Sequence, residues 1–253
     1  MEMTQSHAWV VEKLYTEKLT PYRRFISFFR SRDALRTLFD DSELVRPNLR
    51  ILDAGAGFGT ATFALLEALR SRNIDPEVID AFDLTPAMLA QFRCALDSQN
   101  ITQVRLKQAN VLELDRSLPS SWSNYDLIIS ASMLEYVARP ELSNALSVLR
   151  ARLAPKGALL VIITRKNWIT KILIELWWQA TRYSCQELRD TFAAAGFRDL
   201  AFSRFPLRYF WQNLSNHVVV AKRGEAVQDI AGAGKEAPKL HGTTPREDDC
   251  CAN

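Results

Sequence analysis

Residues 51–59 read ILDAGAGFG, and this stretch decides the fold of the chain. It begins as a short apolar run typical of a buried strand, and it ends in three glycines at alternate positions, Gly55, Gly57 and Gly59. Such glycines let the backbone turn tightly and let a ligand approach where a Cβ would block it. A helical run follows at 61–69, so the unit is a strand, a glycine loop and a helix, which is the setting for a nucleotide-like cofactor. The alternative is a tight turn that holds no ligand.

The spacing of this loop excludes the two commonest phosphate-binding loops. A dinucleotide site requires Gly-x-Gly-x-x-Gly, but here the third glycine comes one residue early and Thr60 stands in its place. A P-loop requires Gly-Lys followed by Ser or Thr, and none follows Gly59. Asp53 lies just before the loop, where a carboxylate suits a ligand with an ammonium group better than one with phosphates.

The next segments follow in the order that a cofactor site needs. Residues 78–83 predict a second strand that ends in Asp83, where an acid commonly accepts hydrogen bonds from a ribose diol. Thr85 predicts the N-cap of the next helix, which has a proline in its first turn. A third strand at 104–107 precedes Asn110, which either presents a donor and an acceptor to an adenine edge or is only a turn residue.

As a set, these motifs resemble the class I S-adenosylmethionine-dependent methyltransferases. The resemblance covers roughly residues 45–222 and also rests on three further segments, which are the pair Asn110-Val111, the fourth strand and its loop at 125–137, and the turn and fifth strand at 153–162. Many relatives carry Asp where Asn110 stands. The amide oxygen can still accept from the adenine amine, so the departure does not remove the expected contact.

The resemblance implies the fold, the cofactor and the binding roles. The fold is α/β, a Rossmann-like, doubly wound, seven-stranded, mostly parallel sheet with the last strand antiparallel, plus an N-terminal helical extension. The cofactor is S-adenosyl-L-methionine, with Asp53 at the methionine ammonium, the three glycines at the cofactor backbone and Asp83 at the ribose hydroxyls. Asn110 and Val111 are expected to contact the adenine, and Ser130 and Ala131 to lie near the methionyl part. Leu84 and Met88 are also expected to contact the cofactor.

The chain divides into three regions. Residues 1–48 form an N-terminal helical cap, residues 49–222 alternate strands and helices as a methyltransferase domain does, and residues 223–253 have the composition of a disordered tail. Late in the domain, Ser184 and Glu187 predict a capping box that starts a helix.

An insert at 164–183 follows the fifth strand and is apolar over most of its predicted helical surface. Trp168, Trp177 and Trp178 are therefore candidates for a substrate pocket. Three interpretations stay open: a helix packed in the core, a hydrophobic lid or wall over the substrate, and a contact with a membrane surface or a second copy.

The N-terminal segment leaves a similar choice. A helix that starts near residue 20 places aromatic side chains beside arginines. It is either an amphipathic helix packed on the domain with solvated arginines or a contact for nucleic acid or anionic lipid. In the family that the chain resembles, such an extension often caps the cofactor cleft, which makes Tyr22 a candidate for the substrate pocket.

The sequence leaves the catalytic residue unknown. Methyl transfer from a sulfonium needs alignment and exclusion of water, and it needs a general base only if the acceptor must lose a proton. Glu135 and Tyr136, in the loop after the fourth strand, are the candidates, and the alternative is an ordinary pair at the start of a helix. His217 opens an apolar strand and is expected to be a core residue.

Composition narrows the class of protein. The net charge of +3 over 253 residues is too small to imply a nucleic-acid partner, and the four cysteines show neither metal-ligand spacing nor a disulfide framework. No secretory signal or membrane-spanning run is apparent, so a cytoplasmic location is expected. The sequence predicts a methyltransferase for a small, hydrophobic acceptor, without indicating the oligomeric state. An RNA or protein methyltransferase and a non-catalytic cofactor-binding subunit are the alternatives.

Overall fold

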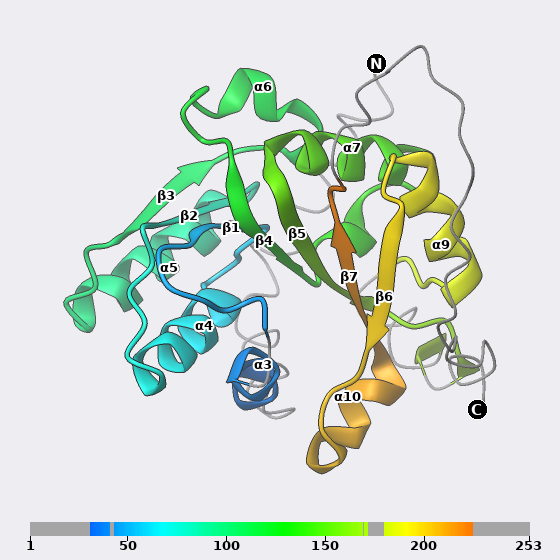
Figure 1. Cartoon of the computed structure of the whole chain (residues 1–253), viewed down its shortest axis with the longest axis horizontal. Coiled ribbons are helices and arrows are strands. Elements are labelled where there is room, and N and C mark those ends of the chain that lie inside the picture. Colours follow the sequence, from blue (N-terminus) through cyan, green and yellow to red (C-terminus); the bar gives the residue numbers. More distant parts are fainter. Residues whose placement is uncertain (1–30, 41–42, 169, 172–179, 225–253) are drawn as a thin grey trace, which may run out of the picture.

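A computed structural model describes residues 31–40, 43–168, 170–171 and 180–224. Its centre is a seven-stranded sheet of order β3-β2-β1-β4-β5-β7-β6 (Figure 1). The strands are β1 Arg50–Ala54, β2 Val78–Asp83, β3 Val104–Gln108, β4 Tyr125–Ala131, β5 Leu153–Thr164, β6 Asp199–Ser203 and β7 Asn216–Lys222. The helices and 3-10 turns are α3 Ser31–Asp40, α4 Thr60–Ser71, α5 Pro86–Ser98, η1 Val111–Glu113, α6 Leu114–Ser117, η2 Leu134–Tyr136, η3 Arg139–Glu141, α7 Leu142–Arg152, α9 Cys185–Ala194, η4 Leu207–Tyr209 and α10 Phe210–Ser215.

Strand directions confirm the predicted fold class. β1 to β5 run parallel, and β7 is antiparallel to both β5 and β6. Parallel neighbours need helical crossovers, which cover both faces of the sheet and explain why β1, β2, β4 and β5 are largely buried. The edge strands β3 and β6 are mostly exposed or half-buried. The fold is therefore the expected doubly wound sheet with an antiparallel last strand.

Two hydrophobic clusters fill the layers on either side of the sheet. In β1, Ile51 packs into the cluster with α3, α4 and α5, whereas Leu52 and Ala54 pack into the cluster with α6, α7 and α9. Successive side chains of a strand point to opposite faces, so one strand serves both clusters. Figure 1 shows α4 and α5 on one side of the sheet and α7 and α9 on the other.

Local capping signals fix the helix ends as the sequence predicts. Thr85 is the N-cap of α5 with a proline in its first turn, although its side chain makes no capping hydrogen bond. Ser184 and Glu187 form the predicted capping box of α9, in which each side chain accepts from the backbone N–H of the other residue. The chain leaves α9 through Gly196 at φ +86°, a left-handed conformation that favours glycine.

One boundary differs from the sequence expectation. After β4 the chain forms the turn η3, and α7 then runs to Arg152, next to the start of β5 at Leu153. The turn expected before the fifth strand is instead an irregularity within β5, where Lys156 has φ +69° and the register with β4 shifts. A local bulge of this kind preserves the pairing on both sides of it.

Several expectations fall outside the described residues. They concern the N-terminal helix with Tyr22, the middle of the insert with Trp177 and Trp178, and the tail from residue 225. The described end of the N-terminal region is α3, which packs on α4. Its Arg32 pairs with Glu67 and its Arg36 with Asp40 at 3.6 Å, so these two arginines are engaged by acids of the chain itself.

Candidate functional site

The glycine loop follows β1, which is the strand at which the order of strands in the sheet changes direction. β1 is flanked by β2 on one side and β4 on the other, and Asp53 lies in register with Ala81 and Ile129. In doubly wound sheets, ligands bind beyond the carboxyl ends of the strands at this switch point. The loops after β1, β2 and β4 therefore form the candidate site.

The three glycines of the loop have different surroundings. All have positive φ, at +75° for Gly55, +56° for Gly57 and +90° for Gly59. A Cβ on Gly55 would lie 2.2 Å from Met133 Cγ, and one on Gly59 would lie 2.2 Å from Phe92 Cε2. A Cβ on Gly57 would meet no atom of the described residues within 4 Å. Among the described residues, Gly57 is thus the glycine of this loop beside open space, where a ligand could approach the backbone.

Asp53 is a buried carboxylate with one oxygen in use. Asp53 is only 1% exposed, and its Oδ2 accepts a hydrogen bond from Thr62 Oγ1 at 2.6 Å. Oδ1 has no hydrogen-bond partner within the described part of the chain. Burial raises the pKa of Asp53 to about 6, the hydrogen bond from Thr62 opposes the rise, and the nearby Asp83 adds to it. A cationic ligand group at Oδ1 would satisfy the orphaned oxygen.

Asp83 fastens the glycine loop to the end of β2. Its Oδ2 accepts from the backbone N–H of Gly57 at 2.8 Å, and Oδ1 accepts from that of Thr85, also at 2.8 Å. Burial raises the pKa of Asp83, and the backbone hydrogen bonds from Thr85 and Gly57 oppose the rise. Hydrogen bonds from the Thr85 side chain and the Leu84 backbone also reach this carboxylate, and its expected contact with ribose hydroxyls stays a prediction.

The remaining residues expected near the nucleoside differ in how they are held. Leu84 is half-buried and its carbonyl accepts from Gln108 Nε2, while Met88 is buried in α5. Asn110 is the N-cap of η1, because its Oδ1 accepts from the backbone N–H of Leu112 at 3.1 Å. Val111 packs in the core with the α7 cluster. In this arrangement Nδ2 of Asn110 is the atom that could donate to an adenine nitrogen.

The end of β4 contributes a second orphaned polar atom. Ser130 is fully buried and its Oγ has no partner among the described residues. Ala131 is half-buried at the end of the strand, and Ser132 follows with φ +57°. The turn brings Met133 against Gly55, so the loops after β1 and β4 are packed together.

The candidate base Glu135 accepts hydrogen bonds from Thr164 of β5. It is only 4% exposed, Oε1 accepts from Thr164 Oγ1 at 2.8 Å, and Oε2 accepts from the Thr164 backbone N–H at 3.3 Å. Burial raises the pKa of Glu135 to about 7, and the hydrogen bonds from Thr164 limit the rise. Tyr136 is half-buried in the same 3-10 turn. The geometry of Glu135 suits a carboxyl that ties β4 to β5.

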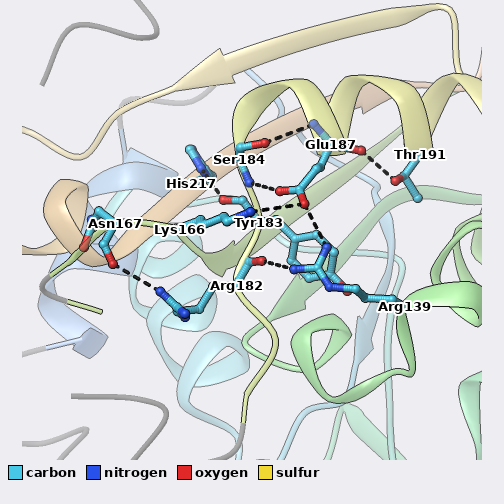
Figure 2. A network of polar contacts seen from close by, with 9 residues as sticks. All are labelled: Arg139, Lys166, Asn167, Arg182, Tyr183, Ser184, Glu187, Thr191 and His217. Carbon is cyan, nitrogen blue, oxygen red and sulfur yellow. Dashed lines mark hydrogen bonds and ion pairs between the residues drawn. The ribbon is translucent and has the colours of Figure 1, made fainter. Parts of the chain in front are cut away.

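A polar network holds the two ends of the insert beside this loop (Figure 2). Tyr183 N donates to Thr164 O at 3.0 Å and Lys166 N donates to Tyr183 O at 2.8 Å, while Thr181 N donates to the Glu135 carbonyl at 2.9 Å. Arg139 lies over the Tyr183 ring, with its guanidinium carbon 4.8 Å from the ring centroid. It also donates to Glu187 at 2.9 Å, which connects the network to α9.

Two further residues belong to the insert or contact it. His217 is buried, its Nε2 lies 3.0 Å from the Tyr183 carbonyl oxygen, and burial lowers its pKa to about 4, so it is the core residue that the sequence indicates. Trp168 is 74% exposed at the start of the insert, and its place in a substrate pocket stays a prediction.

Sequence reasoning missed the partners that hold the site together. Thr62 supports Asp53, Thr164 supports Glu135, and the Phe92 and Met133 side chains occupy the space that a Cβ would need. A polar residue at the end of the apolar run of β5 was the one available signal for Thr164. The others depend on contacts between distant segments.

The described residues hold no cluster of three or more histidine, cysteine, aspartate or glutamate side chains that could bind a metal ion. Among the same residues, every helix is too short or too polar to cross a bilayer.

Known proteins share both this sequence pattern and this fold. Residues 52–159 match a family model described as a methyltransferase domain. The chain is 22% identical over 213 residues to the 2-methyl-6-phytyl-1,4-hydroquinone methyltransferase of Arabidopsis thaliana chloroplasts, a match that covers 83% of this chain and 56% of that protein. The chain spans about half the length of the curated relatives it matches.

Solved structures extend the likeness to the fold. The magnesium protoporphyrin IX methyltransferase of Synechocystis PCC 6803 with bound SAH has a TM-score of 0.63 at 18% identity, over 85% of this chain and 99% of that one. PigF with SAH has a TM-score of 0.65 at 20% identity, over 83% of this chain and 61% of that one. The chain therefore shares the fold of these methyltransferases, and its residues 52–159 match a methyltransferase domain.

Proposed function

We propose that the protein is an S-adenosylmethionine-dependent methyltransferase that acts on a small, hydrophobic acceptor. One observation carries the proposal. Within the part of the chain that the structure describes, the buried Asp53 keeps an oxygen without a partner, next to a loop in which Gly57 borders open space. A ligand with an amino-acid part matches both features, because its ammonium group would meet the Asp53 oxygen and its backbone would lie against Gly57.

The residues divide the binding between them. Asp53 would accept from the methionine ammonium, Gly57 would admit the ligand at the loop backbone, and Asp83 would accept from the ribose hydroxyls. The Ser130 hydroxyl, buried and without a described partner, would donate to the methionyl part. Each assignment uses a polar group that has remaining hydrogen-bonding capacity in the structure.

The bound donor supplies an electrophilic methyl group on sulfur, which a nucleophile of the acceptor attacks in line. The protein's contribution is to orient the two reactants and exclude water, which is worth up to about 7 to 11 kcal/mol of barrier in the best oriented cases. Glu135 does not need to move a proton in this scheme. We propose instead that it fixes the loop after β4 through Thr164.

The small, hydrophobic acceptor is part of the proposal, and two observations support it. The relatives named above act on a phytyl hydroquinone and on a porphyrin, which are small molecules with large apolar parts. The insert after β5 is apolar in sequence, and its described ends lie beside the loop after β4. A cytoplasmic location stays a prediction from the sequence.

The direct experiment combines binding with transfer. Calorimetry with the donor and with its demethylated product should give heat, and incubation with isotopically labelled donor and fractionated metabolites should label an apolar small molecule, identified by mass spectrometry. The Gly57→Val variant, which fills the open space, should lose both signals. Binding without any labelled product would indicate a non-catalytic subunit, and label in RNA or protein would contradict the acceptor class. Absence of binding to either ligand would refute the function.

A further inference from the structure

The described large apolar side chains that are exposed gather on two neighbouring segments. Leu207 is 89% exposed and Phe210 57%, and Leu214 follows on the same connection between β6 and β7. Their spacing of three and four residues places them along one side of η4 and α10. Trp168, at the start of the insert, is the fourth exposed side chain.

A side-chain and a backbone hydrogen bond hold these two segments together. Asn167 Nδ2 donates to the Leu214 carbonyl at 2.5 Å, and Arg165 N donates to the Ser215 carbonyl at 2.8 Å. Because Trp168 directly follows Asn167 in the sequence, it lies next to the end of α10. We call the exposed side chains of residues 165–168 and 204–214, together with Lys171, the α10 face.

The α10 face is basic as well as apolar. The sequence from 164 to 171 and from 203 to 216 contains no aspartate or glutamate. Among the described residues these segments carry the cations Arg165, Lys166, Lys171, Arg204 and Arg208. Lys166 forms an ion pair with Glu187 of α9 at 3.6 Å. Arg208 donates to Thr37 Oγ1 of α3, a neutral partner at 2.8 Å.

The α10 face lies at the same edge of the sheet as the candidate site. β6 and β5 are both antiparallel to β7, so β6 runs parallel to β1 and ends at the edge where the glycine loop begins. Figure 1 shows α10 and α3 beyond this edge. A surface that binds the α10 face would thus lie close to the loops after β1 and β4.

We propose that the α10 face docks the protein on an anionic lipid bilayer. Exposed aromatic and aliphatic side chains flanked by cations are the combination that inserts into the headgroup region of such a surface. A second copy of the chain is disfavoured, since a symmetric contact would set the cations of one copy against those of the other. Nucleic acid would leave the four apolar side chains without a partner.

Docking would bring the site to the layer in which a lipid-like acceptor dissolves. This consequence rests on the proposed function, whereas bilayer binding itself does not. The two can fail separately, because binding to vesicles and binding of the methyl donor are measured independently.

The test is flotation of the full chain with vesicles of phosphatidylcholine alone and of phosphatidylcholine with phosphatidylserine. The chain should float with the anionic vesicles, stay in solution with the neutral ones, and be released as salt screens the charges. Leu207→Ser with Phe210→Ser should lower the bound fraction about tenfold. Lys171→Glu should lower it several-fold, while Arg93→Glu, the same charge change at an exposed position of α5, should not.

Three outcomes would overturn the proposal. They are absence of flotation, equal flotation of the double serine variant, and equal flotation with both kinds of vesicle. Sedimentation velocity without vesicles covers the remaining case: a wild-type dimer that the double serine variant converts to a monomer would make the α10 face an interface between copies. Unchanged melting temperature and donor affinity in each variant establish that the loss is local.

Discussion

Strand β1 and the loop after β4 each carry a buried carboxyl group, and the hydrogen bonds of the two groups differ. Asp53 is held by Thr62 and keeps its Oδ1 without a described partner. Glu135 receives hydrogen bonds at both oxygens from Thr164. A buried charge needs a partner, so the difference separates a carboxylate that requires a ligand from one that the fold already satisfies.

The largest effect is expected within the glycine loop. Gly59→Ala adds a Cβ 2.2 Å from the buried Phe92 ring at a residue with φ +90°, so overpacking and backbone strain should together remove about 3 kcal/mol of stability. Urea unfolding measures the loss. Gly57→Ala is the matched control, since its Cβ enters open space and should lower stability by only about 1 kcal/mol. Equal losses in the two variants would remove the distinction between packed and ligand-facing glycines.

The second prediction concerns the pH dependence of stability. The folded-state pKa of Glu135 is raised from 4.5 to about 7, so the folded state favours the protonated form and stability should fall as pH rises through 7. Asp53 and His217 also titrate differently in the folded and unfolded states over this range, so the informative quantity is the difference in stability between the wild type and Glu135→Gln, in which their contributions cancel. Between pH 5 and pH 8 the wild type should lose about 2 kcal/mol relative to the variant in urea titrations at each pH. A difference that stays constant or grows over this range would contradict the assignment.

Features that depend on neighbouring residues could be predicted from the sequence, whereas contacts between residues far apart in the chain could not. The strand and glycine loop at 51–59 are local, because apolar strand residues and positive φ at glycine leave a mark in neighbouring positions. The capping box of Ser184 and Glu187 is equally local. The pairing of Glu135 with Thr164 joins residues 29 positions apart, and no pattern in either segment indicates it. The same holds for Phe92 against Gly59, which only the folded chain brings together.

A third prediction tests the ribose assignment without disturbing the loop that Asp83 fastens. An S-adenosylhomocysteine analogue that lacks both ribose hydroxyls should bind the wild type more weakly by about 1 to 3 kcal/mol, because the carboxylate loses its donors. Calorimetry compares the two ligands on one protein. Equal affinities would place the ribose away from Asp83.

The smallest effect is expected in the network around the insert. Arg139→Ala removes a cation over the Tyr183 ring and an exposed ion pair with Glu187, which together should be worth about 1 kcal/mol of stability. Arg93→Ala on α5 is the control and should leave the urea midpoint unchanged. If both variants behave alike, the network contributes nothing measurable to the folded state.

The ionisation of Asp53 provides the most direct test of the account. Its pKa of about 6 means that the carboxyl is charged at pH 8 and increasingly protonated below pH 6. Calorimetric titration with S-adenosylhomocysteine from pH 8 to pH 5 should show a constant affinity that falls by up to about tenfold per pH unit once the pH is below 6. Asp53→Asn should bind weakly with little pH dependence. Equal affinities of the variant and the wild type at pH 8 would contradict the claim that Asp53 holds the ammonium group of the cofactor.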